Sequence, residues 1–475
     1  MNQNTCPLLQ KLIAFQSEHS ISFHVPGHKN GKQWLHTKTN QVFQKFLAFD
    51  VTELSGLDDF HHPSECIREA EQLLTDLYGS GESHFLVNGS TVGNLAAVLS
   101  SCKAGEMVLI GRNSHKSMIH ALKMTGVKPI FISNRYDSAY GIEDTINIDN
   151  WIDAIHTYSN VRAIILTSPS YYGQWISLKK LIHEAHRFGI IVICDEAHGA
   201  HFILGEPFGT SAITEGADLV IQSAHKTLPA MTMGSYIHIK DNFPYQEKLK
   251  FYLGALQSSS PSYPIMASLD YARYHLSKIK QEGFQNILRS VQKVEKILSE
   301  HPKLEVIHSA YKKDPLKIWV RAKNGLSGYM LQKSFEEVGI YTELATEAFV
   351  LFIHPLGQFL EEGVFKEKLA KLHVPHSWKE KVSYTMEHIQ MKPFLWSYDE
   401  LDKMDRMVIP FQESAGKISA ENIVPYPPGI PIIMDGEQIT DEKIETLNHL
   451  LKINVTIEAK QYFKEGMIQV YEEAK

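Results

Sequence analysis

Cysteine is scarce in this chain, and signals for export or membrane insertion are missing. Only 4 of the 475 residues are cysteines, namely Cys6, Cys66, Cys102 and Cys194, and no two of them form a C-x-x-C pair. We therefore expect reduced thiols rather than a disulfide framework. The first residues lack a basic region followed by an apolar signal core, and no apolar run approaches the roughly 18 residues of a membrane span. These absences predict a cytoplasmic protein without membrane contact.

Basic residues are not in excess, and the histidines follow no metal-ligand pattern. The formal net charge is −7, from 47 Lys and Arg against 54 Asp and Glu, which argues against a nucleic-acid-binding protein. The 24 histidines form no H-E-x-x-H or similar spacing, and His61-His62-Pro63 is typical of a loop, so no metal site is expected. A hydrophobic content of 43% with 21% charged residues is that of a globular protein, and the length predicts two or three domains.

Apolar runs alternate with amphipathic stretches from Glu65 to about Pro302. The runs are Phe85–Val87, Met107–Ile110, Ile130–Ile132, Ala163–Leu166, Ile190–Ile193 and Leu219–Ile221. This alternation predicts βαβ units around a mostly parallel sheet. Apolar residues at helical spacing then predict one long helix over residues 284–298. The later runs Leu304–Ile307, Lys317–Val320 and Ala348–Ile353 predict a small α+β domain.

Chemically capable residues follow two of these strands directly. Asp195 and His198 follow the run Ile190–Ile193. The run Leu219–Ile221 is followed by Ser223, His225 and Lys226. The carboxyl ends of buried parallel strands are where α/β folds place their ligands. A lysine one strand away from a buried aspartate is the pairing that a pyridoxal phosphate protein needs, because the lysine forms the Schiff base and the aspartate keeps the pyridine nitrogen protonated. Taken singly, Asp195 would be a helix cap and Lys226 a solvated charge.

A glycine turn follows the first predicted strand. Asn88-Gly89-Ser90-Thr91 comes directly after Phe85–Val87 and precedes apolar residues at helical spacing. The first turn of such a helix presents hydroxyl groups and free backbone N–H groups, which suit a phosphate. The alternative interpretation is an ordinary helix cap.

Seven segments together resemble the Orn/Lys/Arg decarboxylase family of fold type I pyridoxal phosphate enzymes. Besides the two strand ends, they are Phe23–Gly31, Leu57–Pro63, Arg112–Ser117, Ser258–Tyr263 and Pro425–Pro431. The resemblance implies an α/β fold with an aspartate aminotransferase-like large domain, a mostly parallel sheet and small α+β C-terminal domains. The domains are expected at residues 1–60 (an N-terminal arm without sustained periodicity), 61–302 (cofactor-binding), 303–395 (small α+β) and 396–475 (C-terminal decarboxylase-family domain). Pro425–Pro431 is expected to be an ordered, turn-rich segment.

The resemblance also implies roles for individual residues. Those similar to the family's cofactor-binding set are Ser90, Thr91, His115, Asp195, Ser223, His225, Lys226 and Ser258. Pyridoxal 5'-phosphate is the implied cofactor, with Lys226 as its attachment point and Asp195 at its pyridine nitrogen. His115 would stack on the cofactor ring, and His198 would orient the substrate or handle protons. No metal ligand is implied.

The implied activity is decarboxylation of arginine, lysine or ornithine to a polyamine-type amine and carbon dioxide. The distal cation of such a substrate needs an anionic partner, for which Glu53, Asp58, Asp59 and Glu343 are the candidates. Two other functions stay open: another fold type I enzyme, such as an aminotransferase or a carbon–sulfur lyase, and a cofactor-binding protein without turnover. Aminotransferases usually hold the substrate carboxylate with an arginine of the small domain, and Arg321 is the only arginine between Pro302 and Asp402.

The resemblance further implies a homodimer or a dimer of dimers with shared active sites. Segments at the position of Ser258–Tyr263 commonly reach the cofactor phosphate of the neighbouring subunit. The Phe23–Gly31 motif begins too early for the amino-terminal wing of the large inducible bacterial members, so the ring assembly that such wings support is not expected. The small-molecule substrate is the only other partner expected.

Overall fold

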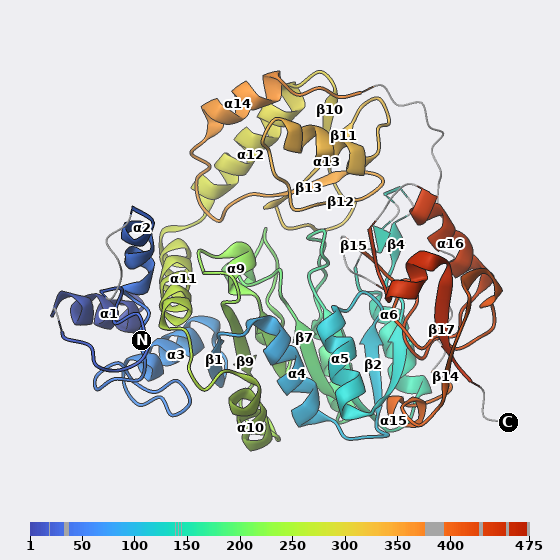
Figure 1. The fold of residues 1–475 in the computed structure, drawn as a ribbon, viewed down its shortest axis with the longest axis horizontal. Helices are drawn as coiled ribbons and strands as arrows, with labels where there is room; N and C mark the ends of the chain where they lie inside the picture. Colours follow the sequence, from blue (N-terminus) through green and yellow to red (C-terminus); the bar gives the residue numbers. More distant parts are fainter. Residues whose placement is uncertain are drawn as a thin grey trace. The chain divides into compact units, whose positions relative to one another are not determined.

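The computed structural model describes residues 1–18, 20–32, 38–137, 139–140, 142–143, 145–375, 394–426, 431–452 and 456–472. Its largest sheet has seven strands in the order β1-β9-β8-β7-β6-β2-β3 (Figure 1). These strands are β1 Glu82–Leu86, β2 Met107–Gly111, β3 Lys128–Ile132, β6 Val161–Thr167, β7 Ile191–Asp195, β8 Leu219–Gln222 and β9 Ser235–Ile239. The pairs β2–β3, β2–β6 and β7–β8 are parallel, whereas β9 runs antiparallel to β1 and β8. The predicted α/β class is confirmed, and each predicted apolar run lies in or overlaps one of these strands.

The chain divides into two compact units. The first comprises residues 1–100, 177–182 and 193–286, and the second comprises residues 101–176, 183–192 and 287–475. The four-domain division expected from the sequence stays a prediction. No helix in the described part of the chain combines the length and the apolarity that crossing a bilayer requires.

The N-terminal residues of the first unit form helices that the sequence pattern did not indicate. They are α1 Pro7–Ser17 and α2 Lys38–Leu47. Leu8 and Leu12 are buried, and α1 packs against α3 Cys66–Tyr78 and α11 Tyr263–Glu282. The backbone N–H of Leu8 also donates to Asp270 Oδ2 on α11, at 3.0 Å. The sequence did not indicate α1, because a few buried residues such as Leu8 and Leu12 leave too faint a periodic pattern in so short a helix. The N-terminal arm over residues 1–60 stays a prediction.

Helix α4 Gly89–Ser101 lies directly against the sheet. A Cβ atom added at Gly93 would come within 2.8 Å of Leu86 Cδ1 and 2.9 Å of Ile221 Cγ2, so only glycine allows this approach. Residues 177–286 add α7 Lys179–Arg187, the 3-10 turn η1 Phe202–Leu204, α8 Ala212–Glu215, α9 Ala224–Thr227 and α10 Gln246–Leu256.

The second unit contains a four-stranded antiparallel sheet in the order β10-β11-β13-β12. Its strands are β10 Leu304–Ile307, β11 Lys317–Ala322, β12 Leu344–Ala345 and β13 Val350–Ile353. The other elements up to residue 375 are α5 Lys116–Thr125, β4 Tyr136–Asp137, β5 Ile142–Glu143, α6 Ile148–Thr157, α12 Gln285–Glu300, α13 Gly328–Glu337 and α14 Glu362–Ala370. The predicted long helix and the three predicted strands of the small domain are confirmed.

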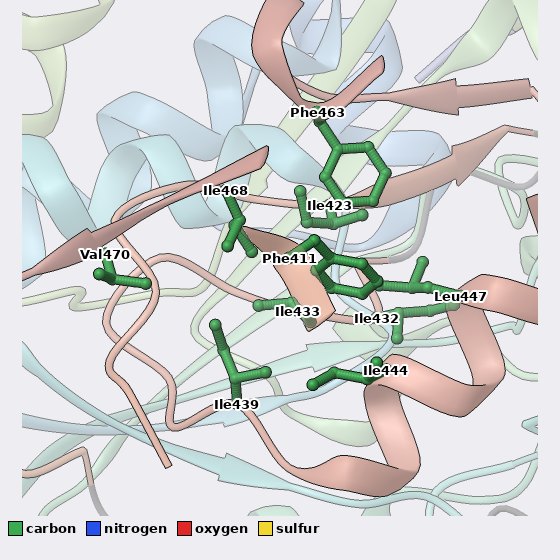
Figure 2. Close-up of a cluster of buried hydrophobic side chains, with 10 residues drawn as sticks. All are labelled: Phe411, Ile423, Ile432, Ile433, Ile439, Ile444, Leu447, Phe463, Ile468 and Val470. Atoms are coloured by element: carbon green, nitrogen blue, oxygen red, sulfur yellow. The ribbon is translucent and has the colours of Figure 1, made fainter. Parts of the chain in front are cut away.

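Residues 394–472, called here the C-terminal segment, have their own apolar core (Figure 2). The core residues are Phe411, Ile423, Ile432, Ile433, Ile439, Ile444, Leu447, Phe463, Ile468 and Val470. The elements around them are α15 Tyr398–Leu401, β14 Arg406–Pro410, η2 Phe411–Glu413, β15 Val424–Tyr426, α16 Asp441–Lys452, β16 Thr456–Glu458, η3 Gln461–Glu465 and β17 Met467–Tyr471. Strand β14 pairs with β17, and β15 pairs with β16. Part of the predicted turn-rich segment is therefore strand, while residues 427–430 lie outside the described residues.

Candidate active site

The parallel pairing of β7 and β8 places their polar continuations at one edge of the sheet. Asp195, the last residue of β7, lies opposite Ile221, and Ser223 opens the one-turn helix α9 directly after β8. Lys226 lies on that turn, with its Nζ 3.1 Å from Nε2 of His198. Because His198 is only 4% exposed, this contact is largely shielded from solvent. The structure thus brings together three of the predicted site residues.

Asp195 is a buried carboxylate with acceptor capacity to spare. It is 3% exposed, and its two oxygens accept hydrogen bonds from Asn94 Nδ2 at 2.9 Å and from the Ala197 N–H at 3.1 Å. Both donors are neutral, and Asp195 has no cationic partner among the described residues. An ionised carboxylate accepts about four hydrogen bonds and is costly to bury without a cation. This environment fits a protonated pyridine nitrogen.

Three serine hydroxyls converge beside this edge. Ser90 Oγ, in the first turn of α4, lies 2.7 Å from Ser223 Oγ and 3.2 Å from Ser235 Oγ. Gly89 reaches this turn with φ of 78°, in the left-handed region that glycine tolerates best. Thr91 is exposed on the same turn. Hydroxyls grouped at the N-terminus of a helix of this length suit a phosphate, so the donor set fits the phosphate end of the expected cofactor.

His225 has one ring nitrogen committed to the backbone. Its Nδ1 lies 2.9 Å from the Gly234 carbonyl oxygen, which can only accept, so Nδ1 must donate. Burial and the neighbouring Lys226 charge lower the pKa of His225, although the bond to Gly234 opposes this shift. Without a ligand, the neutral ring therefore leaves Nε2 as an acceptor. His225 could add positive charge to a phosphate site only if the bound anion raised its pKa enough for the ring to take up a proton.

A buried network lies next to Asp195. Glu196 is 1% exposed and accepts hydrogen bonds from Ser211 Oγ at 3.1 Å, the Ala212 N–H at 2.8 Å and Gln222 Nε2 at 3.3 Å. Burial raises the pKa of Glu196 to about 8 in spite of these donors. Glu196 is therefore mostly neutral at pH 7, so Asp195 has no second negative charge beside it.

His115 and Ser258 occupy other parts of the chain. His115 belongs to the second unit and caps α5, with Nδ1 accepting from the Ser117 N–H at 3.2 Å, so its stacking on the cofactor stays a prediction. Ser258 is exposed, and its N–H donates to Asn88 Oδ1 at 3.2 Å. Further along the same segment, Ser262 caps α11. A crossing of Ser258–Tyr263 to a second subunit also stays a prediction.

The four acidic candidates for the distal cation differ in environment. Asp58 is a helix cap whose two oxygens accept N–H groups at the start of α3, including those of Ser64 and Glu65 at 2.8 Å. Burial would raise the pKa of Asp58, but these backbone donors hold it below its ordinary value. Asp59 accepts from the His61 N–H at 2.8 Å, whereas Glu53 and Glu343 are exposed. Asp58 is thus the least suited of the four to bind a substrate.

The sequence patterns did not indicate Asn94, Ser235 or Glu196. Asn94 was the most accessible to prediction, because it is the only polar side chain between Val92 and Leu99 in an otherwise apolar helix face. Ser235 opens a buried strand directly after Gly234, a weak signal that many strands share. The described residues hold no cluster of three or more His, Cys, Asp or Glu side chains that could bind a metal ion.

Comparison with known proteins assigns the family. The sequence profile of the Orn/Lys/Arg decarboxylase major domain matches residues 6–313, and that of the Orn/Lys/Arg decarboxylase C-terminal domain matches residues 377–463. The chain belongs to the Orn/Lys/Arg decarboxylase family. As a member it is an amino acid decarboxylase, which is a carboxy-lyase, and its cofactor is pyridoxal 5'-phosphate.

Relatives of this decarboxylase match over nearly the whole chain. The uncharacterized protein YaaO of Bacillus subtilis is 42% identical over 480 residues, covering 98% of each chain. The arginine decarboxylase of the same organism is 28% identical, covering 100% of this chain and 99% of the relative. The constitutive lysine decarboxylase of Escherichia coli is 22% identical, covering 94% of this chain and 77% of the relative.

Solved structures confirm the fold type I assignment. The lysine decarboxylase LdcF of Francisella novicida superimposes with a TM-score of 0.79 at 19% identity, covering 99% of this chain and 81% of that one. The constitutive lysine decarboxylase of Escherichia coli gives a TM-score of 0.75 at 18% identity, covering 98% and 82%. At these identities the likeness concerns the fold alone.

Proposed function

We propose that this protein removes the α-carboxylate of a basic amino acid as carbon dioxide, with arginine as the first candidate substrate. The observation that carries the proposal is the 3.1 Å contact between Lys226 Nζ and His198 Nε2, at the sheet edge that also holds the buried Asp195. Arginine is favoured because full-length arginine decarboxylases are 28% identical to this chain, against 22% for the lysine decarboxylases.

Different residues of the first unit would bind different parts of the cofactor. Ser90, Ser223 and Ser235 would hold the phosphate, Asp195 would face the pyridine nitrogen, and Lys226 would be the point of attachment. When bound, pyridoxal phosphate supplies a ring that takes up the electron pair left by the departing carboxylate. The hydrogen bonds from Asn94 and Ala197 to its two oxygens fix the orientation of the Asp195 carboxylate.

His198 and Lys226 form a pair suited to proton movement. A lysine amine attacks a carbonyl carbon only in its neutral form, so Lys226 must first lose a proton. Nε2 of His198 lies within hydrogen-bond reach of Nζ and can accept that proton. Once Nε2 of His198 holds the proton, it can return that proton to Lys226 or deliver it to the substrate carbon that has lost its carboxylate. Burial of His198 keeps bulk water from competing for it.

The proposal is tested by identifying the product. The purified chain, supplied with pyridoxal phosphate, is incubated separately with arginine, lysine and ornithine, and the amines are identified by mass spectrometry. We expect agmatine from arginine, and none from a Lys226→Ala chain under the same conditions. No amine from any of the three substrates would contradict the proposal.

Transamination is the rival that shares Lys226 and Asp195, and it would yield a 2-oxo acid instead of an amine. Aminotransferases usually bind the substrate carboxylate with an arginine of the small domain, and Arg321, the candidate here, already has a partner. Arg321 lies opposite Glu305 in the β10–β11 pair, and its Nε donates to Glu305 Oε2 at 2.8 Å. Binding a substrate carboxylate would require Arg321 to exchange this partner.

A further inference from the structure

Glu196 joins three parts of the first unit through one buried carboxyl group. It directly follows Asp195, the last residue of β7, and is 1% exposed. Its Oε2 accepts from Ser211 Oγ at 3.1 Å and from the Ala212 N–H at 2.8 Å, at the start of α8. Its Oε1 accepts from Gln222 Nε2 of β8 at 3.3 Å. Glu196 takes no part in the proposed chemistry, yet burying a carboxyl group is costly.

The turn after β7 is attached to the sheet at Glu196. The Glu196 N–H donates to the Ile221 carbonyl of β8 at 2.8 Å, and the Glu196 carbonyl accepts from the Gly199 N–H at 2.9 Å. The loop that the second bond closes contains Ala197 and His198. A change in the position of Glu196 must therefore move both of these residues.

Ala197 and His198 each contact a residue of the proposed cofactor site. The Ala197 N–H donates to Asp195 Oδ1 at 3.1 Å, and His198 Nε2 lies 3.1 Å from Lys226 Nζ. Neighbouring residues at the end of an extended strand point to opposite faces, and Glu196 accordingly meets α8. The side chain of Glu196 thus acts on the site through the turn that it holds.

The surroundings of Glu196 favour a neutral carboxyl group. Its three donors are uncharged, and burial raises its pKa to about 8. The negative charge of Glu215 on α8 raises the same pKa further. Burial lowers the pKa of His238 on β9 to about 3 and raises that of Tyr78 on α3, so both side chains stay uncharged.

A hydrogen-bond network accommodates the neutral form of Glu196. His238 Nε2 lies 3.0 Å from Gln222 Oε1, and His238 Nδ1 lies 2.8 Å from Ser83 Oγ. The Ala212 N–H cannot reverse, so Oε2 of Glu196 stays an acceptor and the proton belongs on Oε1. Turning over the Gln222 amide presents its oxygen to that proton and its NH2 group to His238 Nε2. The His238 proton then moves to Nδ1 and points to Ser83.

We propose that Glu196 is a positioning residue of the cofactor site. Its carboxyl group ties the turn that contains Ala197 and His198 to α8 and β8, so that the turn is in place before pyridoxal phosphate binds. The inference rests on the proposed function in one respect, since it takes Asp195 and Lys226 to contact the cofactor.

The test compares Glu196→Ala with Glu196→Gln. Alanine leaves Ser211, the Ala212 N–H and Gln222 without their acceptor. In the cofactor-free chain we expect faster amide hydrogen exchange in a peptide spanning residues 196–202, and an affinity for pyridoxal phosphate lowered about tenfold or more, as loss of a buried hydrogen-bond partner commonly causes. Glutamine reproduces the neutral acid, with its oxygen toward Ala212 and its NH2 group toward the turned Gln222 amide. Glu196→Gln should therefore keep both quantities near their wild-type values at pH 7.

Glu215→Ala is the matched control. Glu215 also lies on α8 and also accepts from a serine hydroxyl and a backbone N–H, but its partners are Ser177 and Leu178, both at 2.6 Å. Neither partner belongs to the turn after β7. Glu215→Ala should therefore lower the melting temperature without changing the exchange of residues 196–202 or the cofactor affinity.

A milder pair of variants keeps the test decisive if Glu196→Ala does not fold. Ser211→Ala removes one donor to Glu196, and Ser177→Ala removes one donor to Glu215. We expect the affinity for pyridoxal phosphate to fall about three- to tenfold in Ser211→Ala and to stay unchanged in Ser177→Ala.

Four results would overturn the proposal. The first is wild-type affinity and exchange in folded Glu196→Ala or Ser211→Ala, and the second is an equal loss of affinity in the Glu215→Ala control. The third is loss of folding in both Glu196→Ala and Ser211→Ala, because Glu196 would then serve stability alone. The fourth is an equal loss in Glu196→Gln and Glu196→Ala, because a neutral group of the same shape would then not suffice. None of these readouts uses an amino acid substrate, so a protein that binds the cofactor but decarboxylates nothing would refute the proposed function and leave this test intact.

Discussion

The substitution Asp195→Asn removes a negative charge while nearly preserving the shape of the side chain. Its effect on stability and its effect on turnover can be estimated separately from the structure. The two donors to Asp195 are Asn94 Nδ2 and the Ala197 N–H. An asparagine has one acceptor oxygen, which would keep the backbone donor because that N–H cannot turn. Its NH2 group would then face Asn94, which must rotate its own amide. One rearranged neutral hydrogen bond costs about 1 kcal/mol, so we expect a folded chain with a slightly lowered melting temperature.

The effect on turnover should be far larger. Removing a preorganised charge from a buried site costs about 3–4 kcal/mol, which corresponds to a fall in kcat of about 100- to 1,000-fold. The hydroxyl cluster and Lys226 remain, so the variant should still bind pyridoxal phosphate. The assay is kcat at saturating cofactor, with binding followed by the absorbance of the bound cofactor. Asn94→Ala is the matched control: it removes a donor but keeps the charge, and should reduce kcat by only about tenfold.

Near-normal turnover of Asp195→Asn in a cofactor-loaded, folded chain would refute this reasoning. Asp195 would then be no more than a cap for the turn at Ala197. Equal losses in Asp195→Asn and Asn94→Ala would also contradict it, because the orientation of the carboxylate, rather than its charge, would then limit the rate.

Two further predictions concern stability and assembly. Burial alone would lower the pKa of His84, but Glu71 and Glu82 raise it from 6.5 to about 9. The stabilisation of the fold by protonated His84 is therefore complete below pH 6.5 and is lost as the pH rises through about 9. The free energy of unfolding in urea should fall over this range in the wild type and change less in His84→Gln. Parallel pH profiles for the two proteins would contradict this prediction. Mixing Lys226→Ala chains with chains mutated at Ser258–Ser260 should restore activity at one of the two sites of a heterodimer, because one interface collects both lesions. Confirmed heterodimers without activity would exclude shared sites.

The sheet and its central site were accessible from the sequence because both depend on local order. Each buried strand is a continuous apolar run, and the first polar residues after β7 and β8 must emerge at the same edge when the strands are parallel. The sequence alone therefore predicts that Asp195, His198 and Lys226 lie close together. The roles of His115 and Ser258 came from the family resemblance alone, and stay predictions.

Features that depend on distant residues were not accessible. Ser235 meets Ser90 only because β9 lies next to both β1 and β8, a strand order that no pattern records. Arg112 and Glu437 form an ion pair although 325 residues separate them, and nothing in either neighbourhood indicates the other. Helix α1 was missed for a different reason, since its burial depends on the helices it meets rather than on its own periodicity.

The central claim is that Lys226 is the residue to which pyridoxal phosphate attaches. Borohydride reduction of the cofactor-loaded protein fixes the cofactor to its lysine, and peptide mapping by mass spectrometry then identifies the position. We expect the reduced cofactor on the peptide that contains Lys226, together with loss of the visible absorption band. Recovery of the label on Lys29 or Lys116, or on no lysine at all, would contradict the account.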